Sequence, residues 1–271
     1  MADEAPEPSV SDRLKQIRKA PPPFRRLTVQ SIESLSPYMR RVVVGGSELE
    51  GFTIPSAASS VRVLVPAPGV ATVVLPTWTG NQFETADGER APIRTFTPRA
   101  QDASGQPPTL TLDVVLHDHG VVTDWVRSAS IGDEVAMSGP GRDETIDPAA
   151  RSHLLAGDES AIPAIAQLLE SIPHDHAVEV HIEIRAADAR IDLPGHPNAT
   201  VTWHENDGVE RAPGHAMADA VNAVTELPDA VWVAGEAAAV QRLRTHLFDE
   251  RGRERSSVTA RGYWKHGRSG S

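Results

Sequence analysis

The segment from Arg94 to Arg99, with the sequence Arg-Thr-Phe-Thr-Pro-Arg, brings two guanidinium groups, two hydroxyls and an aromatic ring together. Side chains alternate along a strand, so Arg94 and Phe96 are expected on one face and Arg99 on the other. An arginine can bind a phosphate through two parallel hydrogen bonds, and an aromatic ring can pack against a flat ligand. Taken alone, the segment fits a polar edge strand better than a ligand clamp.

Two later segments have the order strand, glycine, helix. The first runs from Leu154 to Pro163 and contains Gly157, which would let the backbone approach a ligand, and Asp158, which can cap the helix. The second contains Gly235 in the same relation to its strand. A helix N-terminus attracts phosphate, and open α/β sheets bind ligands at the carboxyl ends of their strands. The G-x-G-x-x-G fingerprint is absent, so ordinary strand-to-helix turns remain an alternative.

A third helix start lies between Val114 and Trp125, where Gly120 precedes a helix that begins near Thr123. This start is a further candidate for binding an anion. The same stretch carries His117 and His119, two residues apart, which could be metal ligands. Because no third ligand is evident, we predict no metal site here.

Short β-rich runs alternate with Gly, Pro, Asn and Asp-rich turns in the first half of the chain, and strands alternate with helices in the second half. The predicted strands of the first half are Arg26–Ile32, Met39–Val44, Ser60–Val65, Ala71–Leu75, Ile93–Arg99, Thr109–Leu116 and Glu134–Met137, with one helix near Val121–Ser130. The predicted strands of the second half are His153–Ala156, Ala177–Ile184, Thr200–His204, Val231–Ala234 and Ser257–Ala260, and its helices are Asp158–Ser171, Gly214–Val224 and Glu236–Asp249.

These patterns divide the chain into three parts. We predict a flexible arm over residues 1–20, an antiparallel β domain over 21–148, and an α/β domain with a parallel sheet covered on both faces over 149–271. The β domain is expected to be a small barrel or a sandwich.

Composition narrows the class of protein. The chain of 271 residues has a net charge of −11, which disfavours binding to nucleic acid or to anionic membranes. It contains no cysteine, which excludes disulfides, cysteine nucleophiles and cysteine-ligated iron–sulfur clusters. No targeting segment and no apolar run of membrane-spanning length is visible. We therefore expect a cytoplasmic protein, and a monomer, whose redox chemistry, if any, uses an organic cofactor.

The order of these motifs, more than any one of them, resembles the siderophore-interacting proteins, a branch of the ferredoxin-reductase-like flavoenzymes. The resemblance covers about residues 24–267 and includes Gly139-Pro140-Gly141, Val233-Ala234-Gly235-Glu236 and Gly262-Tyr263-Trp264. It implies a six-stranded antiparallel FAD-binding β-barrel followed by a doubly wound parallel-sheet NAD(P)H-binding domain.

The resemblance also implies roles for individual residues. It places FAD contacts at Arg94, Thr95, Phe96, Thr97, Arg99, His117, His119, Gly120, Val122, Thr123 and Trp125, nicotinamide-nucleotide contacts at Asp158, Glu159, Ser160, Ala161, Gly235 and Glu236, and aromatic side chains near the isoalloxazine at Tyr263 and Trp264. Phe96 stands where the family usually has tyrosine, so the ring is kept and one hydroxyl is lost.

The implied reaction is hydride transfer from NADPH or NADH to FAD, followed by single-electron reduction of a ferric siderophore or another ferric chelate. The basic residues that match the family's substrate positions are Arg62, Arg127 and Lys265. Arg185 and Arg190 favour NADPH because arginine can bind the 2′-phosphate. Ferredoxin is an alternative donor, and two alternative functions are a flavin reductase with another acceptor and a non-catalytic siderophore-binding module.

Overall fold

The computed structural model describes residues 21–118, 120–141, 147, 149–206 and 211–267. The elements of its first half are β1 (Phe24–Ser36), β2 (Met39–Gly45), η1 (Ser47–Leu49), β3 (Val61–Leu64), β4 (Thr77–Trp78), β5 (Phe83–Glu84), β6 (Arg94–Phe96), β7 (Pro98–Asp102), β8 (Thr109–Val115), α2 (Val121–Ser128) and β9 (Glu134–Ser138). Those of its second half are β10 (Ser152–Asp158), η2 (Glu159–Ala161), α3 (Ile162–Ser171), β11 (Ala177–Ile184), η3 (Ala187–Ala189), β12 (Ala199–Glu205), α4 (His215–Ala223), β13 (Ala230–Glu236), α5 (Ala237–Thr245), η4 (His246–Glu250), η5 (Arg255–Ser257) and β14 (Val258–Trp264).

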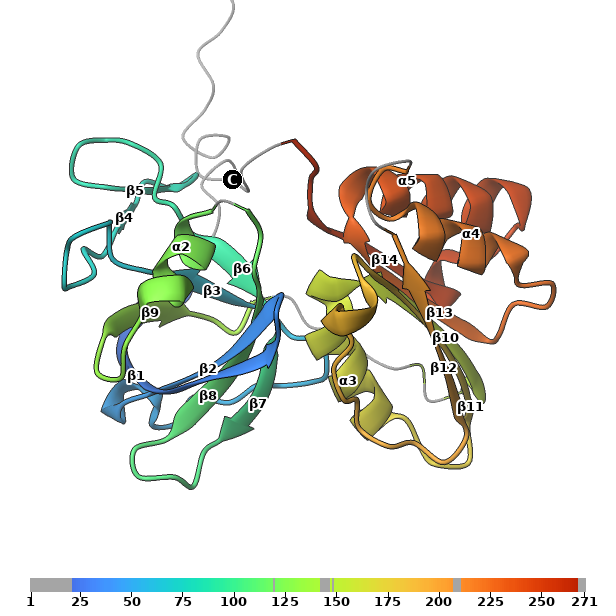
Figure 1. Cartoon of the computed structure of the whole chain (residues 1–271), viewed down its shortest axis with the longest axis horizontal. Coiled ribbons are helices and arrows are strands. Elements are labelled where there is room, and N and C mark those ends of the chain that lie inside the picture. Colours follow the sequence, from blue (N-terminus) through green and yellow to red (C-terminus); the bar gives the residue numbers. More distant parts are fainter. Residues whose placement is uncertain (1–20, 119, 142–146, 148, 207–210, 268–271) are drawn as a thin grey trace, which may run out of the picture.

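The first half forms an antiparallel sheet with the strand order β6-β3-β9-β1-β2-β8-β7, which curls on itself (Figure 1). Its two outer strands, β6 and β7, follow each other directly along the chain and are separated only by Thr97. Because β6 pairs with β3 and β7 pairs with β8, this one stretch joins both edges of the sheet. With β6 and β7 counted as one strand, the expected six-stranded barrel is confirmed.

Alternation of apolar and polar residues along the strands fills the barrel. Leu110, Leu112 and Val114 of β8 point inward, where they meet Val42 and Val44 of β2. Side chains at every second position share a face of a strand, so the same strands turn their remaining residues outward. Val122 and Val126 of helix α2 pack against the same cluster, and this packing fixes where the helix begins.

One predicted strand of the barrel is wrong. The run Ala71–Leu75 forms no strand, and the nearby pairings among the described residues are the short hairpin of β4 and β5 and an isolated bridge between Glu84 and Arg90. Val73 is buried, but its amide donates to the carboxylate of Glu134 at 2.7 Å and its carbonyl accepts from Arg26 at 2.9 Å. The side chains of Glu134 and Arg26 satisfy the backbone groups of Val73, so this segment forms no ladder of hydrogen bonds with a neighbouring strand despite its β-rich composition.

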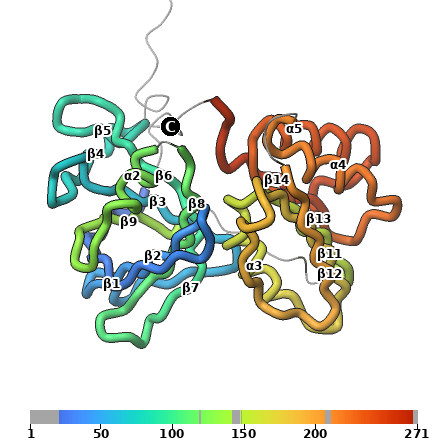
Figure 2. The backbone as a smooth tube through the Cα atoms, viewed as in Figure 1, coloured from blue at the N-terminus to red at the C-terminus, as the bar shows by residue number. Residues whose placement is uncertain are grey.

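The second half is a parallel sheet with the order β12-β11-β10-β13-β14. Strand order reverses between β10 and β13, which places their carboxyl ends at the position where open α/β sheets bind ligands. Helix α3 covers one face through Leu155, and α4 and α5 cover the other through Leu154 and Ala156. The two units follow one another along the chain, from blue to green and then from yellow to red (Figure 2). The division between residues 148 and 149 stays a prediction.

Helix α3 lies between the sheet and the barrel (Figure 1). Its buried residues Ile162 and Ile165 belong to one apolar cluster with Met39 and Val115 of the barrel and with strands β11 and β13. A continuous core therefore crosses the boundary between the two units. Such an apolar boundary keeps their relative orientation fixed, since any rotation would expose core side chains to water.

Truncation of Ile165, which is 0% exposed, should lower the free energy of unfolding by about 2–5 kcal/mol, because it leaves a cavity in this shared core. The measurement is urea denaturation of Ile165→Ala. The matched control is Ile131→Ala, since Ile131 is 74% exposed and its truncation should change the free energy by less than about 0.5 kcal/mol. Equal losses in the two variants would contradict the shared core.

Candidate functional site

Arg94 on β6 is a half-buried cation that lacks an acidic partner among the described residues. Its Nη1 donates to the carbonyl of Ile93 at 3.0 Å. Burial, and then the nearby cation Arg90, lower the pKa of Arg94 below its ordinary value. Both causes disfavour a charge left without a counter-ion, so the site is suited to a bound anion such as phosphate.

The neighbours of Arg94 on the strand take different positions. Thr95 is exposed and lies opposite Arg62 of β3, whereas Phe96 packs against the barrel core. Thr97, at the break between β6 and β7, is only 7% exposed. The ring of Phe96 therefore packs in an apolar environment of the barrel, where a side chain without a hydroxyl fits.

Helix α2 begins at Val121, and its N-cap residue Gly120 offers no side-chain cap. Gly120 has φ 154°, and only glycine adopts such a positive φ readily. The first N–H groups of a helix have no partner within the helix, so here they can bind an anion. Thr123 in the first turn is buried and Trp125 packs against the barrel core, which holds this end of the helix in place.

Two guanidinium groups donate hydrogen bonds to the carbonyls of the loop between β8 and α2. Arg185 donates from Nη1 to the carbonyl of Leu116 at 3.1 Å. Arg127 donates from Nη2 to the carbonyl of His117 at 2.8 Å and from Nη1 to that of Asp118 at 3.2 Å. Arg127, expected to bind substrate, thus has its guanidinium on this loop, and its substrate role stays a prediction.

Asp158 joins three stretches of chain at the carboxyl end of β10. Its Oδ1 accepts from the amide and hydroxyl of Ser160 at 2.9 and 2.5 Å, and its Oδ2 accepts from the amide of Glu236 at 2.8 Å and from Nε1 of Trp264 at 2.7 Å. The side chain is buried, and this burial raises its pKa to about 6 despite the four hydrogen bonds. The carboxylate thereby links the two strand-end turns with the C-terminal aromatic.

Glycine is required at both turns. A Cβ on Gly157 would lie 2.4 Å from the Cβ of Ala161, and a Cβ on Gly235 would lie 2.5 Å from Oδ2 of Asp158. Glu236 then caps helix α5, since its Oε2 accepts from the amides of Ala238 and Ala239 at 2.7 and 2.9 Å. The close approach of β10 and β13 at these turns depends on the missing side chains.

Glu159 forms an ion pair with Arg185, with 2.8 Å between Nη2 and Oε2. The guanidinium carbon of Arg185 also lies 4.9 Å from the ring centroid of Tyr38 in the barrel. Arg185 is therefore engaged between the two units, and Arg190 pairs with Glu205 at 3.1 Å. Both arginines are thus paired with a carboxylate of the chain, and the preference for NADPH drawn from them stays a prediction.

The two C-terminal aromatic side chains, Tyr263 and Trp264, pack against different parts of the structure. The ring of Trp264 lies 5.8 Å from that of His117, in the loop that leads to α2. Tyr263 instead lies 6.4 Å from Trp232 on the sheet. Desolvation and the charge of Arg185 lower the pKa of His117, although its ring reaches solvent. We call the group of His117, Asp158, Glu159, Arg185 and Trp264 the junction.

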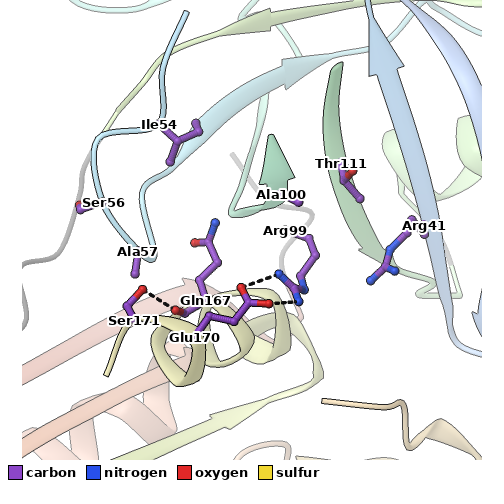
Figure 3. Close-up of a pocket in the computed structure, with 10 residues that line it drawn as sticks. All are labelled: Arg41, Ile54, Ser56, Ala57, Arg99, Ala100, Thr111, Gln167, Glu170 and Ser171. Carbon is purple, nitrogen blue, oxygen red and sulfur yellow. Dashed lines mark hydrogen bonds and ion pairs between the residues drawn. The ribbon is translucent and has the colours of Figure 1, made fainter. Parts of the chain in front are cut away.

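Arg99 lies away from the junction, at the seam between β7 and α3. It forms a two-point ion pair with Glu170, at 2.9 and 2.6 Å (Figure 3). The pair lines a cavity of ≈ 530 Å³ together with Arg41 and Gln167. The amide of Ala58 donates to Oε1 of Gln167 at 2.8 Å, which is a further link between barrel and helix. A contact of Arg99 with FAD stays a prediction.

The remaining predicted residues are less constrained. Lys265 is exposed beside the junction residue Trp264. His119 lies outside the described residues. Within the part of the chain that the structure describes, no group of three or more His, Asp or Glu side chains could hold a metal ion, and no helix is long and apolar enough to cross a membrane. Sequence reasoning missed Arg90 and Tyr38, because their relevance depends on neighbours that are distant in the sequence.

Comparisons with known proteins agree with this geometry. Residues 28–144 match the siderophore-interacting FAD-binding domain, and residues 150–267 match the siderophore-interacting protein family. The crystal structure of a siderophore utilization protein from T. fusca superposes with a TM-score of 0.80 at 31% identity, covering 94% of this chain and 97% of that one. The chain belongs to the siderophore-interacting protein family.

Two relatives of this family member show how far the likeness extends. An uncharacterized protein of Mycobacterium tuberculosis is 36% identical over 264 residues, which is 91% of this chain and 92% of the relative. The NADPH-dependent ferric-chelate reductase of Escherichia coli is 28% identical over 247 residues, covering 89% of this chain and 92% of the relative. This chain is thus related to oxidoreductases that act on ferric chelates.

The buried carboxyl of Asp158 makes stability depend on pH. Its pKa is raised in the folded chain, so its contribution to the free energy of unfolding is fully present below about pH 4 and is lost, by about 3 kcal/mol, as the pH rises through about 6. Asp158→Asn does not titrate. As the pH is lowered from about 7 to about 4, the wild type should therefore gain stability relative to Asp158→Asn. The measurement is the free energy of unfolding of both proteins by urea denaturation at each pH. A difference that is constant or grows at higher pH would contradict this.

Proposed function

We propose that this protein is an FAD-dependent ferric-siderophore reductase that takes electrons from NADPH or NADH. The observation that carries the proposal is the junction. There the strand-end turns of the α/β unit are tied through Asp158 to Trp264, whose ring lies against His117 of the barrel loop. A nucleotide at the turns and a cofactor along that loop would meet at this point.

The residues proposed to hold FAD fit its charge and shape. Arg94 and the uncapped start of α2 at Gly120, Val122 and Thr123 offer a cation and backbone donors to the pyrophosphate. Thr95, Phe96 and Thr97 would line the ring and its chain, with His117 and Trp264 at the junction end. When bound, FAD supplies the ability to accept two electrons as hydride and to release them singly.

The proposed nucleotide site consists of Asp158–Ala161 together with Gly235 and Glu236. The carboxylates of Asp158, Glu159 and Glu236 are engaged in hydrogen bonds within the chain, so their role is to shape two turns. The glycines Gly157 and Gly235 let these two segments pack closely against each other, since a Cβ on either would meet Ala161 or Asp158. NADPH as the donor is supported by the Escherichia coli relative, whose name specifies it.

The proposed substrate is a ferric siderophore, and its recognition is assigned to Arg62, Arg127 and Lys265. Ferric siderophores are often anionic, and basic side chains would attract them locally in a chain whose net charge is −11. Hard oxygen donors bind Fe(III) more tightly than Fe(II), so reduction loosens the complex. In the proposed reaction, Fe(III) would accept a single electron from the reduced flavin, and this electron transfer requires no acid or base from the protein.

Purified protein should bind FAD with the absorption spectrum of a flavoprotein, which NADPH or NADH should bleach. Arg94→Ala should weaken FAD binding by roughly 10- to 150-fold, since a charge-assisted hydrogen bond contributes about 1.5–3 kcal/mol. The matched control is Arg242→Ala, which removes the same charge from an exposed position of α5. A colourless protein that neither binds FAD nor responds to either nucleotide would refute the function and favour a siderophore-binding module.

Reversal of charge at the proposed substrate residues should separate the two halves of the reaction. In Arg62→Glu and Lys265→Glu, the KM for an anionic ferric tricatecholate should rise roughly 5- to 30-fold, because each reversal costs on the order of 1–2 kcal/mol of attraction. Reduction of an uncharged quinone in the same assay should be unchanged, and FAD content is measured as a control. If the charge reversals impair the reduction of both acceptors equally, or impair neither, the result favours a flavin reductase with a different acceptor.

A further inference from the structure

Arg185 makes contacts that join the nucleotide side of the junction to the barrel. Within the α/β unit, Arg185 donates hydrogen bonds to the carboxylate of Glu159. Its backbone amide donates to Oε1 at 2.9 Å, and its Nε donates to Oε2 at 3.0 Å. On the barrel side, Nη1 donates to the carbonyl of Leu116, and the guanidinium lies over the ring of Tyr38. One side chain therefore contacts two units of the fold.

The partner Glu159 belongs to the turn proposed to receive the nucleotide, and its side chain is only 9% exposed. Leu116 directly precedes His117, whose ring lies against Trp264. From Leu116 the chain leads through Gly120 to the start of α2, the proposed phosphate site for FAD. Arg185 thus lies between the turn proposed for the nucleotide and the loop that leads to the proposed FAD site.

The geometry requires arginine in particular. A planar guanidinium can bind a carboxylate at two points, donate to a carbonyl and stack on an aromatic ring at the same time, whereas an ammonium cannot. Removal of the guanidinium would leave the carboxylate of Glu159 buried without its partner and the carbonyl of Leu116 without this donor. The loop and the turn would then lose their fixed separation.

We infer that Arg185 is a positioning residue that sets the distance between the bound nucleotide and the flavin during hydride transfer. The inference rests on the proposed function, because it assigns a task to a residue of the same site. It replaces the expectation that Arg185 binds a 2′-phosphate, since the guanidinium is already paired with Glu159. Hydride transfer is sensitive to such a distance, as a misplacement of about 1 Å can slow a reaction on the order of 100-fold.

The test is stopped-flow kinetics of the FAD-loaded protein and its variants Arg185→Ala and Arg185→Lys. The limiting rate of flavin reduction should fall about 10- to 100-fold with NADPH and with NADH alike. The Kd for FAD should stay within about 3-fold, and the oxidative half-reaction, in which dithionite-reduced protein reduces the ferric tricatecholate, should be unchanged. Arg211→Ala is the charge control, because Arg211 forms an exposed pair with Asp219 on α4.

Other outcomes overturn the inference. A loss confined to the affinity for NADPH would make Arg185 a reader of the 2′-phosphate. Equal losses in both half-reactions, accompanied by a lower Tm in both variants, would make its role structural, and unchanged rates would leave it without a role. If Arg185→Ala does not fold, Arg185→Lys keeps the charge and decides alone. Failure of the wild type to bind FAD would instead refute the proposed function.

Discussion

The buried carboxylate of Asp158 accepts hydrogen bonds from three stretches of chain that are far apart in sequence, and the arrangement of the junction depends on it. Ser160 lies two residues after it, Glu236 ends strand β13, and Trp264 ends strand β14. A carboxylate with four donors is a strong acceptor even when burial opposes its charge, which is why its pKa rises only to about 6. Loss of this one group would separate the switch point of the sheet from the C-terminal aromatic.

The seam between the barrel and the α/β unit gives the junction its fixed geometry. Helix α3 contributes Ile162 and Ile165 to a core that both units share. Polar links lie along the same seam, from Arg99 to Glu170 and from Arg185 to the carbonyl of Leu116. The apolar core resists separation of the units, and these directional polar contacts restrict how one unit turns against the other. The two cofactors of the proposed reaction, one on each unit, would then meet at a defined distance.

Several features of the fold and site were predictable because they depend on short-range pattern. The order strand, glycine, helix at Gly157 and Gly235 and the helix start after Gly120 follow from local sequence and are confirmed, although strands β10 and β13 each continue one residue past the glycine. The prediction of a strand over Ala71–Leu75 was wrong because the side chains of Arg26 and Glu134 form hydrogen bonds with the backbone of this segment. No local pattern reveals these distant partners. Local propensity predicts elements best where neighbouring residues alone satisfy the backbone.

The sequence by itself determined the fold class, the order of its motifs and the family, since alternating hydrophobicity and glycine positions are encoded locally. Only the tertiary structure decided which charged residues are already engaged. Arg99, Arg127 and Arg185 all stood as ligand contacts in the sequence, yet their guanidinium groups bind Glu170, the carbonyls of His117 and Asp118, and Glu159. A long arginine side chain has several partners within reach, so its partner depends on distant segments that folding brings beside it.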